Sequence, residues 1–106
     1  MQIDDFLKLI KNYTENNVTC DEPHVSLRCM ENHITIEEVK KFLLHESEKL
    51  IRIVEDRPKV FNIYYKLSKR QELKIVLDTF TYQRLNIRTV KRLVQKHKIG
   101  FVRRRF

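Results

Sequence analysis

Hydrophobic and polar residues alternate along most of the chain between Lys49 and Arg92. The alternation recurs in four segments, KLIRIVED, KVFNIYYKLS, ELKIVLDTF and RLNIRTVKRL. A period of two places successive side chains on opposite faces of a β-strand, so one face packs inward and the other meets water. Only two or three residues separate consecutive segments, which leaves no room for a crossover helix. We therefore predict a three- to four-stranded antiparallel meander over residues 49–92.

Apolar residues recur at intervals of three and four before this sheet, which indicates helices. Residues 2–16 carry a single apolar stripe, formed by Ile3, Phe6, Leu7, Ile10 and Tyr13. A stripe of this width is typical of a helix that packs on a core, and a partner-binding helix is the alternative. Residues 17–23 are predicted to be a linker, because Pro23 disfavours helical geometry in the residue before it.

A helical pair is predicted over residues 24–48, with a sharp bend at His33 and Ile34. Thr35 can cap the second helix, because Glu38 lies three residues further on and completes a T-x-x-E capping box. The inward side of this second helix is formed by Ile36, Val39, Phe42 and Leu43.

These elements predict an α+β fold for one domain over residues 1–106, with the N-terminal helices packed on one face of a small antiparallel sheet. Residues 93–106 form a basic C-terminal segment, which includes Arg103, Arg104 and Arg105. The outward positions of the strands are largely Lys and Arg. The uncovered face of the sheet is therefore predicted to be cationic and to meet an anionic partner.

The net charge of +8 is concentrated in the second half of the chain. Residues 1–48 hold five Lys/Arg and ten Asp/Glu, a net charge of −5, whereas residues 49–106 hold seventeen Lys/Arg and four Asp/Glu, a net charge of +13. From Arg84 to Phe106 there are nine basic residues and no acidic one. Charge segregated in this way favours nucleic acid as the partner. An acidic protein partner and a merely solubilising surface are the alternatives.

The composition excludes several classes of site. The one glycine, Gly100, leaves no glycine-rich loop for a dinucleotide or a nucleoside triphosphate, so we expect no cofactor. No apolar run approaches the ~18 residues needed to span a membrane, and the acidic, amphipathic start is unlike a signal peptide. We therefore expect a cytoplasmic protein with free thiols and no membrane partner. The 34% of charged residues is also typical of heat-adapted, thermophile proteins.

Two cysteines and two histidines follow a C-x3-H-x4-C-x3-H spacing that invites a zinc interpretation. They are Cys20, His24, Cys29 and His33. On a continuous helix His24 and Cys29 would point about 140° apart, and the spacing is not that of a known zinc finger. We therefore predict no metal site.

The stretch PHVSLRCMENHITIEEV resembles the opening motif of a family of small uncharacterised domains found in mobile elements and archaea. The family pattern is H-A-x-x-R-x-x-E-R-G-I-(S/T)-x-x-x-V, followed by three or four antiparallel strands. The matching residues here are His24, Arg28, Glu31, Ile34, Thr35 and Val39. That family is similar to the RelE/ParE-like toxins, so the resemblance implies a helical pair on a small antiparallel sheet. It also implies RNA cleavage without metal, or target binding without cleavage.

The resemblance covers roughly residues 20–92 and includes two departures. The second arginine of the family pattern is Asn32 here, and its glycine is His33. The motif therefore loses one cation, and a residue with a side chain stands at the bend.

A metal-independent ribonuclease needs a base, cations that stabilise the charged phosphorane, and an acid for the leaving oxygen. The candidate catalytic residues are His24 and Arg28, which lie one turn apart on one helix face. Tyr64 or Tyr65 could stack a base. The residues predicted to bind nucleic acid are Arg52, Tyr64, Lys66, Lys69, Arg70, Arg84, Arg88, Lys91, Arg92, Arg103, Arg104 and Arg105.

The sequence thus predicts a small RNA-binding protein of the RelE/ParE-like toxin type, with RNA favoured over DNA, that could act as a metal-independent ribonuclease. One alternative is a non-catalytic nucleic-acid-binding or adaptor module. Another is an interaction protein whose basic surface meets an acidic, antitoxin-like partner. In both alternatives His24 and Arg28 would only fix their helix to the sheet by hydrogen bonds.

Overall fold

The computed structural model describes residues 1–80 and 84–94, with the backbone alone at residues 79 and 80. The predicted nucleic-acid-binding residues Arg103, Arg104 and Arg105 lie outside the described residues. The helices are α1 (Ile3–Ile10), η1 (Glu15–Asn17), α2 (His24–Glu31), α3 (Ile36–His45) and η2 (Ser47–Lys49), of which η1 and η2 are single 3-10 turns. The strands are β1 (Val18–Cys20), β2 (Leu50–Arg57), β3 (Val60–Ser68), β4 (Gln71–Phe80) and β5 (Leu85–Val94).

The described strands form one sheet in the order β1-β5-β4-β3-β2. Strands β2 to β5 make the predicted antiparallel meander, and the α+β class is confirmed. The prediction of a three- to four-stranded, purely antiparallel sheet is wrong, because β1 adds a fifth strand parallel to β5. Three residues are too few to show a period of two, and their partner strand begins at Leu85, far away in the sequence.

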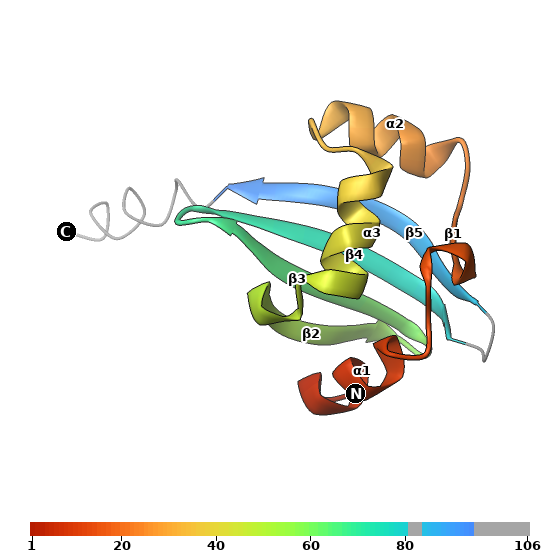
Figure 1. Cartoon of the computed structure of the whole chain (residues 1–106). Helices are drawn as coiled ribbons and strands as arrows, with labels where there is room; N and C mark the ends of the chain where they lie inside the picture. Colours follow the sequence, from red (N-terminus) through yellow and green to blue (C-terminus); the bar gives the residue numbers. More distant parts are fainter. Residues whose placement is uncertain (81–83, 95–106) are drawn as a thin grey trace.

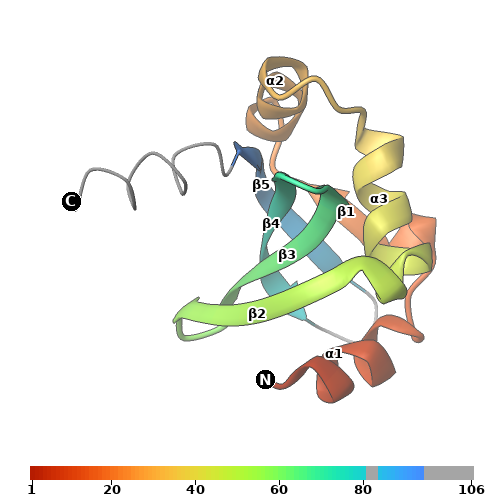
Figure 2. The ribbon, with the colours of Figure 1, turned by 90° about the vertical axis from the view of Figure 1, so that its left-hand side faces the viewer.

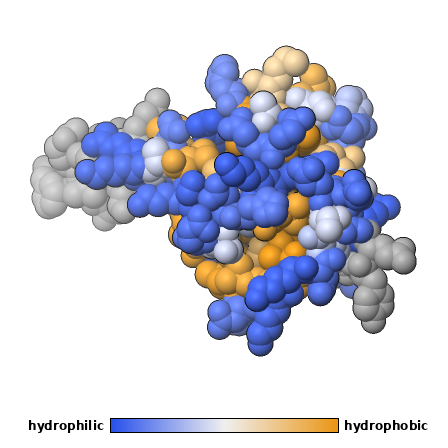
Figure 3. All heavy atoms as spheres, viewed as in Figure 1, coloured by the Kyte–Doolittle hydropathy of each residue, from blue (hydrophilic) through white to orange (hydrophobic). Residues whose placement is uncertain are grey.

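Helices α1 and α3 lie on one face of the sheet, whereas α2 lies along the side of β5 (Figure 1, Figure 2). The inward side chains of β3, β4 and β5 form the core with residues from all three helices. The most completely buried of the helix residues are Phe6, Val25, Val39 and Leu43, each at most 1% exposed. From the helix side, the outer surface around α3 is mainly hydrophilic (Figure 3). No helix among the described residues is long and apolar enough to cross a membrane.

The first helix is shorter than the residues 2–16 predicted from its apolar stripe. It ends at Ile10, and Tyr13 reaches the core from the turn that follows, where it is 6% exposed. Periodicity alone did not distinguish this turn from a further turn of helix, because both place a residue at this position on the buried side.

The predicted capping box at the start of α3 is present. The backbone N–H of Glu38 donates to Thr35 Oγ1 at 3.1 Å, and the backbone N–H of Thr35 donates to Glu38 Oε1 at 3.0 Å. These two bonds satisfy N–H groups that a helix start otherwise leaves without partners. They fix where α3 begins after the bend that follows α2.

The outer edge of β5 is filled by two different elements. Strand β1 pairs with its first residues, Leu85 to Ile87, and the N–H of Asp21 then donates to the carbonyl of Ile87 at 3.0 Å. Beyond this point α2 lies along the edge of β5, and the N–H of Arg92 donates to Asn32 Oδ1 at 2.9 Å. The chain between β1 and α2 therefore brings the helix along the second half of the same strand.

The bend between α2 and α3 places His33 in the left-handed region, with φ of 54°. This is the position at which the family pattern has glycine. The left-handed region costs a residue with a Cβ roughly 1–2 kcal/mol of folding free energy. Glycine avoids this steric cost but loses more conformational entropy on folding, which costs about 0.5–1 kcal/mol. The bend is therefore formed at some expense of stability.

We predict that His33→Gly raises the free energy of unfolding by about 0.5 kcal/mol, because it removes the left-handed strain. Urea denaturation measures the change. His45→Gly, in the last turn of α3, is the matched control and should lower the free energy of unfolding by roughly 0.3 kcal/mol, the difference in helix propensity between the two residues. If both variants are destabilised alike, the bend is not strained at His33.

Candidate nucleic-acid interface

The strand register aligns four polar side chains across the face of the sheet opposite the core. Arg52 of β2 pairs with Tyr64 of β3, Tyr64 with Lys74 of β4, and Lys74 with Lys91 of β5. We call these four residues the cationic row, and the face that carries it the open face. Neighbouring strands lie ~4.8 Å apart, so the row spans roughly 14 Å.

Arg52 is held in place by its neighbours within the row and beside it. Its Nη2 donates to Glu72 Oε1 at 2.9 Å, and its guanidinium carbon lies 4.0 Å from the centroid of the Tyr64 ring. Glu72 is only 8% exposed, so its carboxylate needs this partner. Part of the charge of Arg52 is thereby neutralised, and the guanidinium supports the tyrosine ring from one side.

Lys74 and Lys91 are the cations of the row that stay accessible for an external anion. Among the described residues, no salt bridge engages either ammonium group. Lys91 is exposed and Lys74 is half-buried. Their positive charge is therefore directed at solvent on β4 and β5, next to α2.

The open face is more mixed than the predicted cationic surface. Two rows flank the cationic row. One is uncharged and consists of Val54, Asn62, Val76 and Thr89, and the other contains Lys66 and Glu72. In the uncharged row, Val76 and Asn62 are 8% and 9% exposed, whereas Val54 is 44% exposed. Val54 therefore adds accessible apolar surface beside the cations, as a binding site for an aromatic, negatively charged ligand would require.

A pocket of about 410 Å³ lies between α2 and the open face of β4 and β5. We call it the α2 pocket. Arg28, Glu31 and Asn32 line it from the helix side, and Lys74, Val76, Thr89 and Lys91 line it from the sheet. Because Lys74 and Lys91 belong to both features, the cationic row leads directly into the pocket.

The two candidate catalytic residues both lie where α2 meets β5. Arg28 lines the pocket, and its Nη1 lies 2.7 Å from Oε1 of Glu31, which also lines it. His24 Nε2 lies 3.1 Å from the hydroxyl of Thr89, with the direction of donation set by the imidazole tautomer. His24 therefore contacts a residue of the pocket from the sheet edge, and its bond also fixes α2 to β5.

The structure separates the two tyrosines that sequence reasoning left as alternatives. Tyr65 is 1% exposed, and its ring centroid lies 5.5 Å from that of Phe42 in the core. Its burial raises the pKa of its hydroxyl. Tyr64 is on the open face, so it is the tyrosine available to stack a base.

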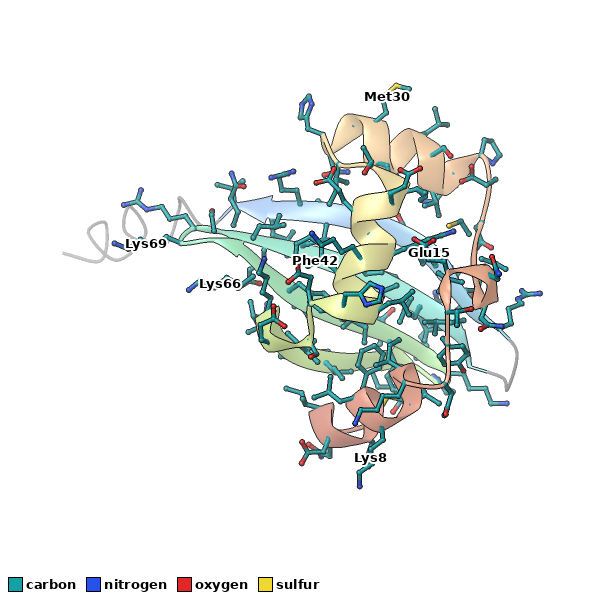
Figure 4. All side chains as sticks on the ribbon, in the orientation of Figure 1. Lys8, Glu15, Met30, Phe42, Lys66 and Lys69 are labelled. Atoms are coloured by element: carbon teal, nitrogen blue, oxygen red, sulfur yellow. The ribbon has the colours of Figure 1, made fainter. Side chains whose placement is uncertain are left out.

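The other predicted nucleic-acid-binding residues are spread around the sheet. Lys66 and Lys69 project from the end of the sheet at which β3 and β4 are joined (Figure 4), and Arg70 follows in the same exposed turn. Arg84 is exposed just before β5. Arg88 stands at a register shift between β4 and β5. None of these five residues lines the α2 pocket.

Arg92 has a structural task that the sequence did not reveal. Its register partner is the core residue Leu73, so it lies on the helix side of the sheet. There its Nε donates to the carbonyl of Asn32 at 2.9 Å, and its Nη2 donates to the carbonyl of His33 at 3.1 Å. Its Nη1 donates to Gln71 Oε1 at 2.9 Å. Arg92 thus holds the end of α2 against β5.

Asn32 completes this contact. Its Oδ1 accepts from the backbone N–H of Arg92, and its Nδ2 donates to the carbonyl of Arg28 at 2.7 Å. The amide therefore links the last turn of α2 to a strand N–H. An arginine side chain at this position could not accept a hydrogen bond, so the contact depends on the amide oxygen of Asn32.

Asn32→Ala should lower the free energy of unfolding by about 1–3 kcal/mol, because it leaves the partly buried N–H of Arg92 without an acceptor. Chemical denaturation measures this loss. Asn16→Ala, at an exposed position of η1, is the control and should change stability by less than about 0.5 kcal/mol. Equal stability of Asn32→Ala and the natural chain would show that the contact does not hold α2.

The cysteines are poor candidates for chemistry. Cys29 is 4% exposed, and burial raises its pKa to about 11. Burial also raises the pKa of Cys20. Both thiols are therefore protonated near neutral pH, whereas nucleophiles and metal ligands need the thiolate. Within residues 1–80 and 84–94, no three His, Cys, Asp or Glu side chains are grouped to hold a metal ion.

Sequence reasoning missed Lys74, which belongs to both the cationic row and the α2 pocket. Its position between the core residues Leu73 and Ile75 indicates an outward direction, so alternation alone could have included it. Its proximity to Arg28 had no such signal, because it depends on how α2 meets the sheet.

No protein-family model, curated protein or solved structure matches this chain. The similarity to RelE/ParE-like toxins therefore stays a prediction. What the site can do follows from its own geometry: four cations, a hydroxyl and an aromatic ring line one continuous surface. Such a surface can bind phosphate groups and stack a base.

Proposed function

We propose that this protein binds RNA and holds a single strand of it across the open face of the sheet. The observation that carries the proposal is the cationic row, in which strand register alone aligns Arg52, Tyr64, Lys74 and Lys91 and leads into the α2 pocket. Phosphates would meet the lysines, and a base would stack on the tyrosine.

A single strand suits this surface better than a duplex. Stacking on Tyr64 needs an unpaired base, and stacking contributes about 1–3 kcal/mol per base in proteins that bind single strands. The tyrosine ring is already supported on one side by Arg52 at 4.0 Å. It is therefore preorganised, and little side-chain entropy is lost when a base arrives.

Two further observations support RNA and a toxin-like role. The segment from His24 to Val39 resembles the opening motif of a family similar to RelE/ParE-like toxins. The segregation of charge, with +13 in residues 49–106, favours a polyanion. An acidic, antitoxin-like protein would meet the same cations and would compete with RNA for them.

Metal-independent RNA cleavage is the second candidate function. It is favoured by the placement of His24, which contacts Thr89 of the pocket, and of Arg28, which lines the same pocket. An imidazole can exchange a proton near neutral pH, and the guanidinium can stabilise a charged phosphorane.

The expected binding behaviour follows from the number of lysines in contact with phosphate. We predict that the double variant Lys74→Gln/Lys91→Gln binds a fluorescent single-stranded RNA at least tenfold more weakly near 0.1 M salt. Its dependence on salt should also be shallower, because each lost phosphate contact lowers the slope by roughly 0.7–1. Fluorescence anisotropy over a range of salt concentrations measures both quantities.

The control variant is Lys8→Gln, on the outer side of α1 and directed away from the sheet (Figure 4). It carries the same Lys→Gln substitution, with the loss of one positive charge instead of two, and should bind RNA as the natural chain does. The proposal is wrong if the control loses as much affinity as the double variant, or if the natural chain binds no RNA. The same mixtures of protein and RNA can be run on a denaturing gel to detect shortened RNA. Cleavage by the natural chain should be abolished in His24→Ala and in Arg28→Ala.

A further inference from the structure

The formal charge of the α2 pocket exceeds what one internal phosphate of a nucleic acid would neutralise. Its lining contains three basic residues, Arg28, Lys74 and Lys91, and one acidic residue, Glu31. Together they carry a formal charge of +2. An internal phosphodiester carries one negative charge. A terminal phosphate monoester carries about −1.5 to −2 at pH 7, with three exposed acceptor oxygens.

Glu31 is paired with Arg28, so a phosphate that binds Arg28 must displace this carboxylate. The two side chains are 2.7 Å apart at Nη1 and Oε1. A diester that displaced the carboxylate would bring to Arg28 no more charge than it removed. A monoester would bring a second charge, which Lys74 and Lys91 are placed to neutralise.

The path of the cationic row points to the same ligand. The row begins on β2, crosses β3 and β4, and ends on β5, where α2 lines the far side of the pocket. Asn32, which lines the pocket, is hydrogen-bonded to the backbone of Arg92 on β5. An RNA strand that follows the row therefore reaches α2 at this point. The pocket is thus placed to receive the end of the RNA.

The hydroxyl of Thr89 adds a neutral donor to the pocket. When His24 donates to it from Nε2, the proton of the hydroxyl is free to point at a ligand oxygen. Three cationic groups and one hydroxyl then approach from the helix and from two strands. A terminal phosphate, with oxygens in three directions, can use more of these donors than a diester can.

We propose that the α2 pocket binds a terminal phosphate monoester of an RNA strand, which takes the place of Glu31 at Arg28. This inference rests on the proposed RNA-binding function. The 5′ and 3′ ends supply the same phosphate chemistry, so the experiment must tell them apart.

The test uses one RNA octamer with an internal fluorophore in three forms: with hydroxyls at both ends, with a 5′-phosphate, and with a 3′-phosphate. We expect one of the two phosphorylated forms to bind the full chain at least tenfold more tightly than the unphosphorylated form. The tighter form identifies the end. Equal affinity for all three forms overturns the inference and leaves RNA binding intact, whereas no binding of any form overturns the proposed function.

The variant Glu31→Gln tests the role of the carboxylate separately. It should bind all three octamers more tightly and widen the preference for the phosphorylated form, because the carboxylate repels a dianionic phosphate more than a monoanionic one. Glu37→Gln, an exposed acid-to-amide change in the first turn of α3, is the matched control and should keep the natural preference. Unchanged affinity of Glu31→Gln for every octamer would show that no phosphate meets Arg28, which would overturn the placement of the phosphate in this pocket. Circular dichroism confirms that both variants are folded.

Discussion

The hydrogen bonds along the outer edge of β5 determine how the rest of the molecule is arranged. A strand edge exposes N–H and carbonyl groups that need partners. Here β1 satisfies the first part of the edge, and Asn32 at the end of α2 satisfies the N–H of Arg92. Because the helix lies beside β5 rather than beneath the sheet, a pocket is left between α2 and the open face.

The same contact connects stability with the proposed function. Arg92 and Asn32 hold the end of α2 from the helix side of the sheet. Arg28, one turn before Asn32, is thereby kept within reach of Lys74 and Lys91. If the helix moved away from β5, the three cations would separate and the pocket would lose its excess positive charge. The amide of Asn32 is thus a positioning group for a site that it also lines.

The two faces of the sheet are distinct because the strands keep their register through the centre of the sheet. Successive residues alternate between the core and the open face, so one aligned set contains Ile63 and Ile75 and the neighbouring set contains Tyr64 and Lys74. A shift of one residue would exchange these sets and bury the lysine. Burial of the core residues therefore fixes the alignment of the cationic row. Contacts among the four side chains of the row are not needed for that alignment.

Local patterns in the sequence predicted much of the fold and less of the site. The α+β class, the order of β2 to β5 and the capping box at Thr35 all follow from short-range periodicity or spacing. Strand β1 could not be predicted, because three residues carry no period and their pairing partner is remote. The bond between Arg52 and Glu72 and the turn of Arg92 toward α2 depend on tertiary contacts, which residue type alone does not show.

Chemical-shift mapping by NMR tests the central claim that the open face binds RNA. The 15N-labelled chain would be titrated with a short single-stranded RNA and its backbone amides followed. The account predicts the largest shifts at Tyr64, Lys74 and Lys91 and at the residues of α2 that line the pocket, with little change on the outer surfaces of α1 and α3. Shifts concentrated on α1 and α3, or none at saturating RNA, would contradict it.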